Sequence, residues 1–161
     1  MLRNGELEFA FLCTTEQPNA EFSCIQGRSD RIAAVLPADH PLAKKRSIQV
    51  GDLESETLVL LSNDSPEYTL CTNACREAGF EPHIGITCRF ESSILDIVST
   101  GFGVGLMYQS HALEGAGPSL AVVDIEPPIF TSIYVLYKEA SLSKAGMAYL
   151  QHLKAQQIIP I

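Results

Sequence analysis

Residues 57–88 read TLVLLSNDSPEYTLCTNACREAGFEPHIGITC, and this stretch predicts a strand, a helix and a second strand in succession. Residues 57–61 are almost entirely apolar, which is typical of a strand buried on both faces. Residues 83–88 return to a strand pattern, with Ile84 and Ile86 on one face. A strand, a helix and a strand in this order form the repeating unit of α/β proteins.

The helix between these strands has a start signal and a stop signal. Ser65 can cap its first turn, Pro66 fits the first helical position, and Glu67 suits the positive end of the helix dipole. Gly79 can adopt the left-handed conformation that ends a helix. We therefore predict a helix that begins after Ser65 and ends before Gly79.

The alternation of strands and helices continues on both sides of this stretch. Ser92 or Ser93 is expected to cap a second helix that Gly101 ends, and Ser141 or Ser143 to open a last helix. The remaining strands are expected at residues 7–13 (fully buried), 22–25, 31–36, 104–108, 120–125 and 130–137, with turns at 27–30 and between 108 and 120. The pattern indicates a doubly wound α/β sheet.

Composition excludes several classes of protein. The 161 residues are 46% hydrophobic and 19% charged, as in an ordinary globular protein, and no apolar run is long enough to span a membrane. Glu6 and Glu8 interrupt the first apolar stretch, which argues against a secretory signal and for the cytoplasm. The net charge is −8, and the only compact basic run is Lys44–Arg46, so we expect this chain not to grip DNA by itself.

Cysteine and histidine residues suggest neither a disulfide framework nor a metal site. The five cysteines are irregularly spaced, the four histidines lie far apart, and no cofactor is expected. Cys71 and Cys75 share one helical face and are interpreted as buried small residues. Their alternative role is that of a redox pair, but thiols at this spacing do not easily reach disulfide geometry within a helix.

The glycine-rich run GFGVG at residues 101–105 does not fit a nucleotide-binding loop. Such a loop needs glycines between a strand and the following helix, whereas these glycines follow a helix and lead into a strand. A helix end and close chain packing explain them. No nucleophile with a base, and no pair of carboxylates on one helical face, indicates an enzyme.

Candidate ligand-binding residues follow the carboxyl ends of predicted strands, where open α/β sheets bind ligands. They are Cys13, Thr14 and Thr15 after the first strand, Ser62, Asn63 and Ser65 after residues 57–61, and Phe90, Glu91 and Ser92 after the strand ending near Cys88. Free N–H groups at a helix start suit a carboxylate or an amide carbonyl. For Ser65, Ser92 and Ser93, helix capping alone is the alternative interpretation.

Six motifs in order resemble the effector-binding (substrate-binding) domain of LysR-type transcription regulators. They are LRNGELEFAFL (2–12), DRIAAVLPADHPLA (30–43), SIQVGDLESETLVLLS (47–62), CREAGFEPHI (75–84), IVSTGFGVGLM (97–107) and LSKAGMAYLQHL (142–153). The resemblance covers nearly the whole chain. One departure is Tyr108, where the family usually has proline.

The resemblance implies a two-lobed fold similar to that of periplasmic binding proteins, with a small-molecule effector in the cleft between the lobes. Residues 37–125 would form a complete lobe two, and residues 1–36 and 126–161 the remnant of a lobe one that lacks its first strands and helices. The effector modulates transcription, and a carboxylate is one candidate for it. DNA contact in this family belongs to a winged helix-turn-helix that is absent here.

The resemblance also implies that effector domains pair into homodimers. We expect association through the remnant of lobe one, because its missing elements leave the apolar faces of residues 7–13 and 130–137 partly uncovered. Two alternatives stay open. They are a thiol-based redox sensor on the same scaffold, and a solute-binding protein of similar fold, which the absence of a signal peptide and the loop His40–Ala43 disfavour.

Overall fold

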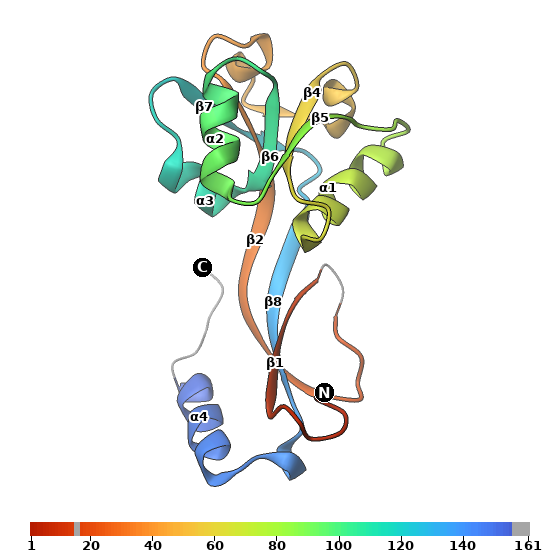
Figure 1. Ribbon diagram of the computed structural model, residues 1–161, viewed down its shortest axis with the longest axis vertical. Coiled ribbons are helices and arrows are strands. Elements are labelled where there is room, and N and C mark those ends of the chain that lie inside the picture. Colours follow the sequence, from red (N-terminus) through yellow and green to blue (C-terminus); the bar gives the residue numbers. More distant parts are fainter. Residues whose placement is uncertain (15–16, 156–161) are drawn as a thin grey trace. The chain divides into compact units, whose positions relative to one another are not determined.

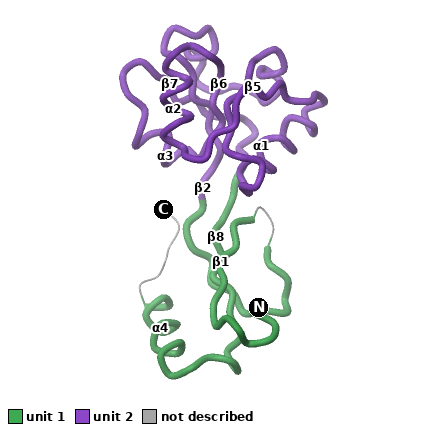
Figure 2. The backbone as a smooth tube through the Cα atoms, in the orientation of Figure 1, with its two compact units in different colours: residues 1–29, 130–161 green, residues 30–129 purple. Residues whose placement is uncertain are grey.

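The computed structural model describes residues 1–14 and 17–155 and divides the chain into two compact units (Figure 2). Unit 2 is the continuous segment Asp30–Ile129, and unit 1 combines Met1–Ser29 with Phe130–Ile161. Both units are built from strands and helices, as the sequence pattern predicts. No helix among the described residues is long and apolar enough to cross a membrane.

Unit 2 is a mixed sheet with helices on both faces (Figure 1). Strand β4 (Thr57–Leu61) lies between β5 (His83–Cys88) and β6 (Val104–Tyr108) and runs parallel to both. The second part of β2 (Ser23–Pro37) runs antiparallel to both β6 and β7 (Leu120–Ile125). The other elements of unit 2 are η1 (Pro41–Lys44), β3 (Ser47–Ile48), η2 (Val50–Leu53), α1 (Pro66–Glu77), α2 (Glu91–Ser99) and α3 (Gln109–Gly115).

Alternate residues of the central strands enter two separate apolar clusters of unit 2. Leu58 and Leu106 pack with Cys71 and Cys75 of α1 on one face of the sheet. Val59 and Met107 pack on the other face, with the apolar residues of α2 and α3, which are Ile94, Leu95, Val98 and Ala112. The expected sheet covered on both faces is therefore confirmed.

Helix α1 has the predicted boundaries because its signals are local. The hydroxyl of Ser65 accepts a hydrogen bond from the backbone N–H of Tyr68 at 3.0 Å, and Pro66 opens the helix. Gly79 ends it with φ at +98°, and the N–H of Phe80 returns to the carbonyl of Cys75.

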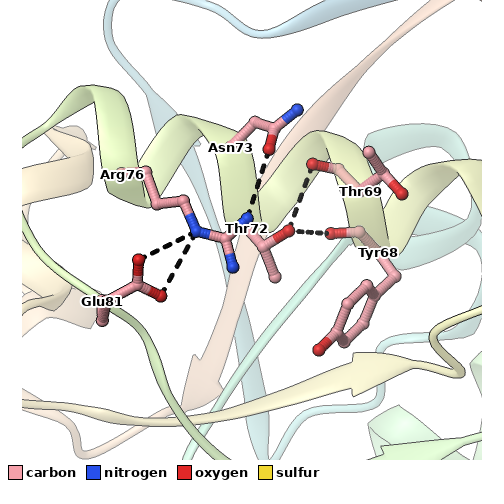
Figure 3. Close-up of polar contacts among 6 residues, drawn as sticks. All are labelled: Tyr68, Thr69, Thr72, Asn73, Arg76 and Glu81. Carbon is pink, nitrogen blue, oxygen red and sulfur yellow. Dashed lines mark hydrogen bonds and ion pairs between the residues drawn. The ribbon is translucent and has the colours of Figure 1, made fainter.

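Side chains along the same helix form hydrogen bonds within it and just beyond its end (Figure 3). The buried hydroxyl of Thr72 donates to the carbonyl oxygens of Tyr68 and Thr69, so its polar group is satisfied within the helix. The guanidinium of Arg76 reaches past the helix end, where its Nε lies 3.0 Å and 3.2 Å from the two carboxyl oxygens of Glu81.

The glycine-rich run ends α2 and lets β6 approach its neighbours closely. Gly101 takes the left-handed conformation with φ at +81°. A Cβ atom on Gly103 would lie 2.2 Å from the carbonyl oxygen of Thr57, and one on Gly105 would lie 2.7 Å from the side chain of Ile94. The interpretation as a helix end with close packing is confirmed.

The turn predicted at residues 27–30 is wrong. Strand β2 continues from Ser23 to Pro37 without a break. The hydroxyl of Ser29 lies 2.8 Å from that of Ser132 on β8 (Phe130–Tyr137), and Gln26 also donates to Ser132. A neighbouring strand thus supplies hydrogen bonds that a turn would not offer, and this tertiary pairing overrides the turn preference of Gly27 and Asp30.

Two further expectations need correction in unit 2. Helix α2 begins at Glu91 after Phe90, which makes no side-chain capping bond, so neither Ser92 nor Ser93 is the cap. The connection expected to be a turn between residues 108 and 120 contains helix α3. This helix buries only Ala112 and leaves Leu113 exposed, so it carries little apolar periodicity from which it could be predicted.

In unit 1, strand β1 (Phe9–Thr14) pairs antiparallel with β8 (Phe130–Tyr137), and α4 (Lys144–Ala155) follows the short helix η3 (Glu139–Ser141). The hydroxyl of Ser143 caps the first turn of α4. The expectation of a fully buried first strand is wrong, since the side chain of Phe11 is 67% exposed. The expectation that apolar residues of β1 and β8 lie partly uncovered is confirmed by Phe11, Leu12, Phe130 and Ile133.

Candidate functional site

The carboxyl ends of three parallel strands meet at one edge of the unit 2 sheet (Figure 1). Helices α1, α2 and α3 begin there, directly after β4, β5 and β6. Strand β2 runs antiparallel to β6, with Ile32 opposite Tyr108, so its preceding residues belong to the same edge. We call this the polar edge of unit 2 and define it by Asp30–Arg31, Ser62–Glu67, Phe90–Ser92 and Tyr108–His111. Such an edge is where open α/β sheets bind ligands.

The loop after β4 is ordered by hydrogen bonds to its neighbours. The backbone N–H of Ser62 donates to the carbonyl of Cys88 at 2.7 Å, which joins the ends of β4 and β5. The hydroxyl of Ser62 donates to the carboxylate of Asp64 at 2.6 Å and lowers the pKa of that carboxyl, with a smaller contribution from the charge of Arg89. Asn63 is exposed beside them.

At the end of β5, Glu91 turns toward α3. Its carboxylate lies 2.6 Å from Nδ1 of His111, and the contact becomes an ion pair when His111 is protonated. Phe90, directly before it, is 68% exposed. Ser92 is exposed in the first turn of α2, near the positive end of the helix dipole.

The residues that follow β6 form hydrogen bonds with Asp30 and Arg31 of β2. The hydroxyl of Ser110 donates to the carboxylate of Asp30 at 2.5 Å. The guanidinium of Arg31 donates to the side-chain oxygen of Gln109 at 2.8 Å and lies 3.2 Å from the carboxylate of Asp124. Arg31 pairs with Asp124 rather than with the neighbouring Asp30. Within the described residues, Asp30 therefore forms no ion pair with a cationic side chain.

Glu67 is a buried carboxyl group without an ordinary hydrogen-bond partner. Its side chain lies in the first turn of α1, the residue is 2% exposed, and neither carboxyl oxygen forms a hydrogen bond of normal geometry with a described residue. Burial raises the pKa of Glu67 to about 8, and the charges of Glu91 and Asp30 contribute to the rise, whereas the backbone of Tyr108 opposes it. Glu67 is therefore mostly protonated at neutral pH.

The sequence-predicted ligand residues fall into two sets. Ser62, Asn63, Ser65, Phe90, Glu91 and Ser92 lie together on the polar edge of unit 2. Cys13 and Thr14 belong to unit 1, where they pair with Ile133 and Ser132 of β8, and Thr15 lies outside the described residues. Ser65 caps a helix, so its hydroxyl already has a structural role.

Sequence reasoning missed other polar groups of this edge. The strand-end rule, applied to β6, points to Gln109, Ser110 and His111, but the segment was interpreted as a turn. Asp30 reaches the edge through an antiparallel pairing that no local signal encodes. Glu67 was assigned to the helix dipole, because a sequence gives no sign that a particular first-turn carboxyl is buried.

The structure favours the structural interpretation of the unit 2 thiols. Cys71 and Cys75 are buried, and burial raises the pKa of Cys71 well above its usual range and that of Cys75 to about 11. A thiol of high pKa is a poor nucleophile, since the thiolate is the reactive form. Among the described residues, no group of three or more His, Cys, Asp or Glu side chains is arranged to hold a metal ion.

A hollow of about 370 Å³ lies at the opposite edge of the unit 2 sheet. It is lined by Pro37, Ala38, Asp39, Ser99, Thr100, Gly101 and Ser119. It is broad and open, and Asp39 is the one charged side chain of its lining. The polar edge concentrates more charged and hydrogen-bonding groups, which makes it the better candidate site for an ordered ligand.

Curated relatives of this chain are transcription regulators. It is 28% identical over 130 residues to the transcriptional dual regulator GltC of Bacillus subtilis, a match that covers 79% of this chain and 42% of GltC. The chain thus spans less than half the length of that relative.

Solved structures share the fold. The regulatory domain of Synechocystis CcmR in complex with 2-PG superposes with a TM-score of 0.80 at 20% identity, covering 99% of this chain and 78% of that one. Full-length OxyR from Pseudomonas aeruginosa superposes with a TM-score of 0.77 at 22% identity, covering 98% of this chain and 54% of that one. These likenesses confirm the predicted α/β fold of the periplasmic-binding-protein type.

The model of one protein family matches the chain almost from end to end. That family is described as the LysR substrate binding domain, and the match covers residues 1–157. The described elements occur in the order that the six sequence motifs predict. This chain therefore belongs to the LysR substrate-binding domain family.

Proposed function

We propose that the polar edge of unit 2 binds a small-molecule effector and that the bound effector modulates transcription by the intact regulator. The observation that carries this proposal is the convergence of three helix N-termini and their polar side chains at one edge of a sheet, in a chain of the LysR substrate-binding family. The chain acts as a regulatory module rather than an enzyme. CcmR, a structural neighbour, binds 2-PG, which supports a small molecule as the ligand.

The polar edge suits an acidic or carbonyl group of an effector at its helix starts. Unpaired backbone N–H groups at a helix N-terminus carry partial positive charge and favour a carboxylate. Asn63 and Ser92 are exposed beside two of these starts. Ser62, Ser65, Phe90 and Glu91 complete the proposed contacts in unit 2, and Cys13, Thr14 and Thr15 remain predictions.

In the intact regulator, we propose that DNA binding, effector binding and self-association fall to different surfaces. DNA contact falls to a segment of the intact regulator other than this chain, whose net charge of −8 opposes binding to phosphates. The cytoplasm, where transcription regulators act, is the expected compartment. Self-association through the exposed apolar side chains of unit 1 is the expected assembly.

A matched pair of asparagine substitutions tests the proposed site. A panel of carboxylic acids, amino acids and amines is screened for compounds that raise the melting temperature of the chain, and the strongest is titrated by calorimetry. We expect Asn63→Ala to weaken its binding at least about fivefold, since a lost ligand hydrogen bond is worth about 1 kcal/mol. Asn73→Ala, an exposed change in the middle of α1, the helix that follows the loop of Asn63, is the control. Equal binding by both variants would place the site elsewhere.

A further inference from the structure

Three carboxyl groups from three different elements gather at the polar edge. Glu67 comes from the first turn of α1, Glu91 from the first turn of α2, and Asp30 from β2. The charges of Glu91 and Asp30 are the ones that act on Glu67. Glu91 and Asp30 are both half-buried, whereas Glu67 is buried.

Arg31 and His111, which can carry positive charge at the polar edge, are already engaged, and the exposed Arg89 beside the edge acts on the carboxyl of Asp64. Arg31 is held by Gln109 and Asp124, and His111 contacts Glu91. Asp30 accepts from the hydroxyl of Ser110 and from the backbone N–H of Arg31, which are weaker donors than a cation. Glu67 has neither a cation nor an ordinary hydrogen bond among the described residues. The cluster is therefore short of positive charge and of hydrogen-bond donors.

A buried carboxyl without a hydrogen bond of normal geometry destabilises a fold and calls for an explanation. A neutral or apolar residue in the first turn of α1 would avoid this cost. The helix dipole does not require burial, since a first-turn carboxylate also interacts favourably with it from the surface. The cost is offset when a ligand supplies the missing donors.

We propose that Glu67, flanked by Asp30 and Glu91, forms a subsite for a cationic nitrogen of the effector, a protonated amine or a guanidinium. This inference rests on the proposed function and narrows its ligand class. The N-termini of the helices would bind a carboxylate or carbonyl group of the effector, and the acidic cluster would bind its amine. The effector is therefore a small molecule that carries an acidic or carbonyl group and a cationic nitrogen. Glu91 and Asp30, which are only half-buried, are the accessible carboxyl groups of the subsite.

Binding of a cation at Glu67 is coupled to release of a proton. The pKa of Glu67 is about 8, so the free protein holds a proton there at neutral pH. A cationic nitrogen favours the ionised carboxylate and displaces that proton. The charged and titratable groups facing Glu67 are Asp30, Glu91 and the thiol of Cys71, and His111 lies beyond Glu91. Affinity therefore rises with pH by up to about tenfold per unit below the pKa of Glu67.

Four compounds of equal chain length test this subsite. They are 4-aminobutyrate, putrescine, succinate and 1,4-butanediol, titrated into the chain by NMR and calorimetry between pH 6 and 7.5. We expect 4-aminobutyrate and putrescine to bind more tightly than 1,4-butanediol and to release close to one proton, measured in buffers of different ionisation enthalpy. Glu67→Gln keeps the size of the side chain but cannot ionise, so we expect at least tenfold weaker binding and no proton release.

Glu77→Gln is the matched control, an exposed glutamate of the same helix. It should leave affinity and proton release unchanged, which separates the subsite from general attraction to an acidic protein. The proposal is overturned if Glu67→Gln binds the amines as the unchanged chain does, if their binding does not depend on pH, or if neither amine binds. Binding of succinate alone would overturn it but leave the proposed function standing. If neither these compounds nor the wider panel bind, the proposed function itself fails.

Discussion

Unit 2 buries the apolar residues of its sheet on both faces, whereas in unit 1 large apolar side chains of β1 and β8 lie exposed. Both apolar clusters of the described residues lie entirely within Asp30–Ile129. In unit 1, Phe11 and Phe130 are 67% and 56% exposed, although Val135 and Leu150 are buried. A continuous segment can thus complete its own core, while a unit assembled from two ends of the chain leaves a surface that another chain or segment can cover.

The free energy of local opening should differ between the units, and the reaction rates of the cysteine thiols measure this difference. Cys13 and Cys24 belong to unit 1 and are half-buried and exposed, whereas Cys71, Cys75 and Cys88 are buried in unit 2. We expect Cys24 to react with a thiol reagent at least about 1,000-fold faster than the unit 2 thiols, which react only after opening. Mass spectrometry of modified peptides over time measures this difference.

The same experiment with dilute peroxide addresses a redox role. The raised pKa values of Cys71 and Cys75 predict that both stay reduced in the native chain. Oxidation of these two thiols alone in the folded monomer would favour the redox-sensor interpretation. It would also contradict the expectation that the buried thiols of unit 2 are the less reactive ones.

A rise in pH from about 4.5 to 8 should weaken unit 2 alone, because the buried carboxyl of Glu67 lies there. Its pKa is near 4.5 in an unfolded chain and about 8 in the folded one, so between these values the folded state holds a proton that the unfolded state has lost. Its contribution to stability is complete below about pH 4.5 and is lost as the pH rises through 8. The slope is about 1 kcal/mol per pH unit.

Hydrogen exchange of individual amides at several pH values separates the units. In the unchanged chain, the opening free energy of α1 and β6 should fall with pH relative to that of α4, after correction for intrinsic exchange. Glu67→Gln should remove most of this slope, and Glu77→Gln should not. An unchanged slope in Glu67→Gln would show that other groups carry the pH dependence.

The smallest effect on stability is expected at the exposed apolar surface of unit 1. Phe11→Ser should change the free energy of unfolding by less than about 0.5 kcal/mol, since the side chain is mostly exposed. It should nevertheless lower the average mass in light scattering at tens of micromolar protein, because the phenyl ring lies on the expected contact surface. A clean monomer before the substitution would contradict the expected association.

Much of the fold was predictable because its signals are local. Ser65, Pro66 and Gly79 act within one or two turns of the chain, so the bounds of α1 follow from the sequence. The strands at 57–61, 83–88, 104–108, 120–125 and 130–137 have the predicted bounds, since apolar runs end at turn residues. The rule that ligands bind beyond strand ends likewise selected Ser62, Ser65 and Glu91 before any contact was known.

The sequence alone determined most of the strands and helices, their order and the family. Tertiary structure alone decided that β2 runs unbroken through Gly27 and Asp30, because side chains of β2 form hydrogen bonds with Ser132 of the neighbouring strand β8. It also decided the environment of Glu67, whose burial depends on side chains from α2 and β2 that are distant in sequence. Helix caps and apolar periodicity depend on residues a few positions apart, whereas the solvation of one carboxyl depends on the whole packed edge, which no local pattern records.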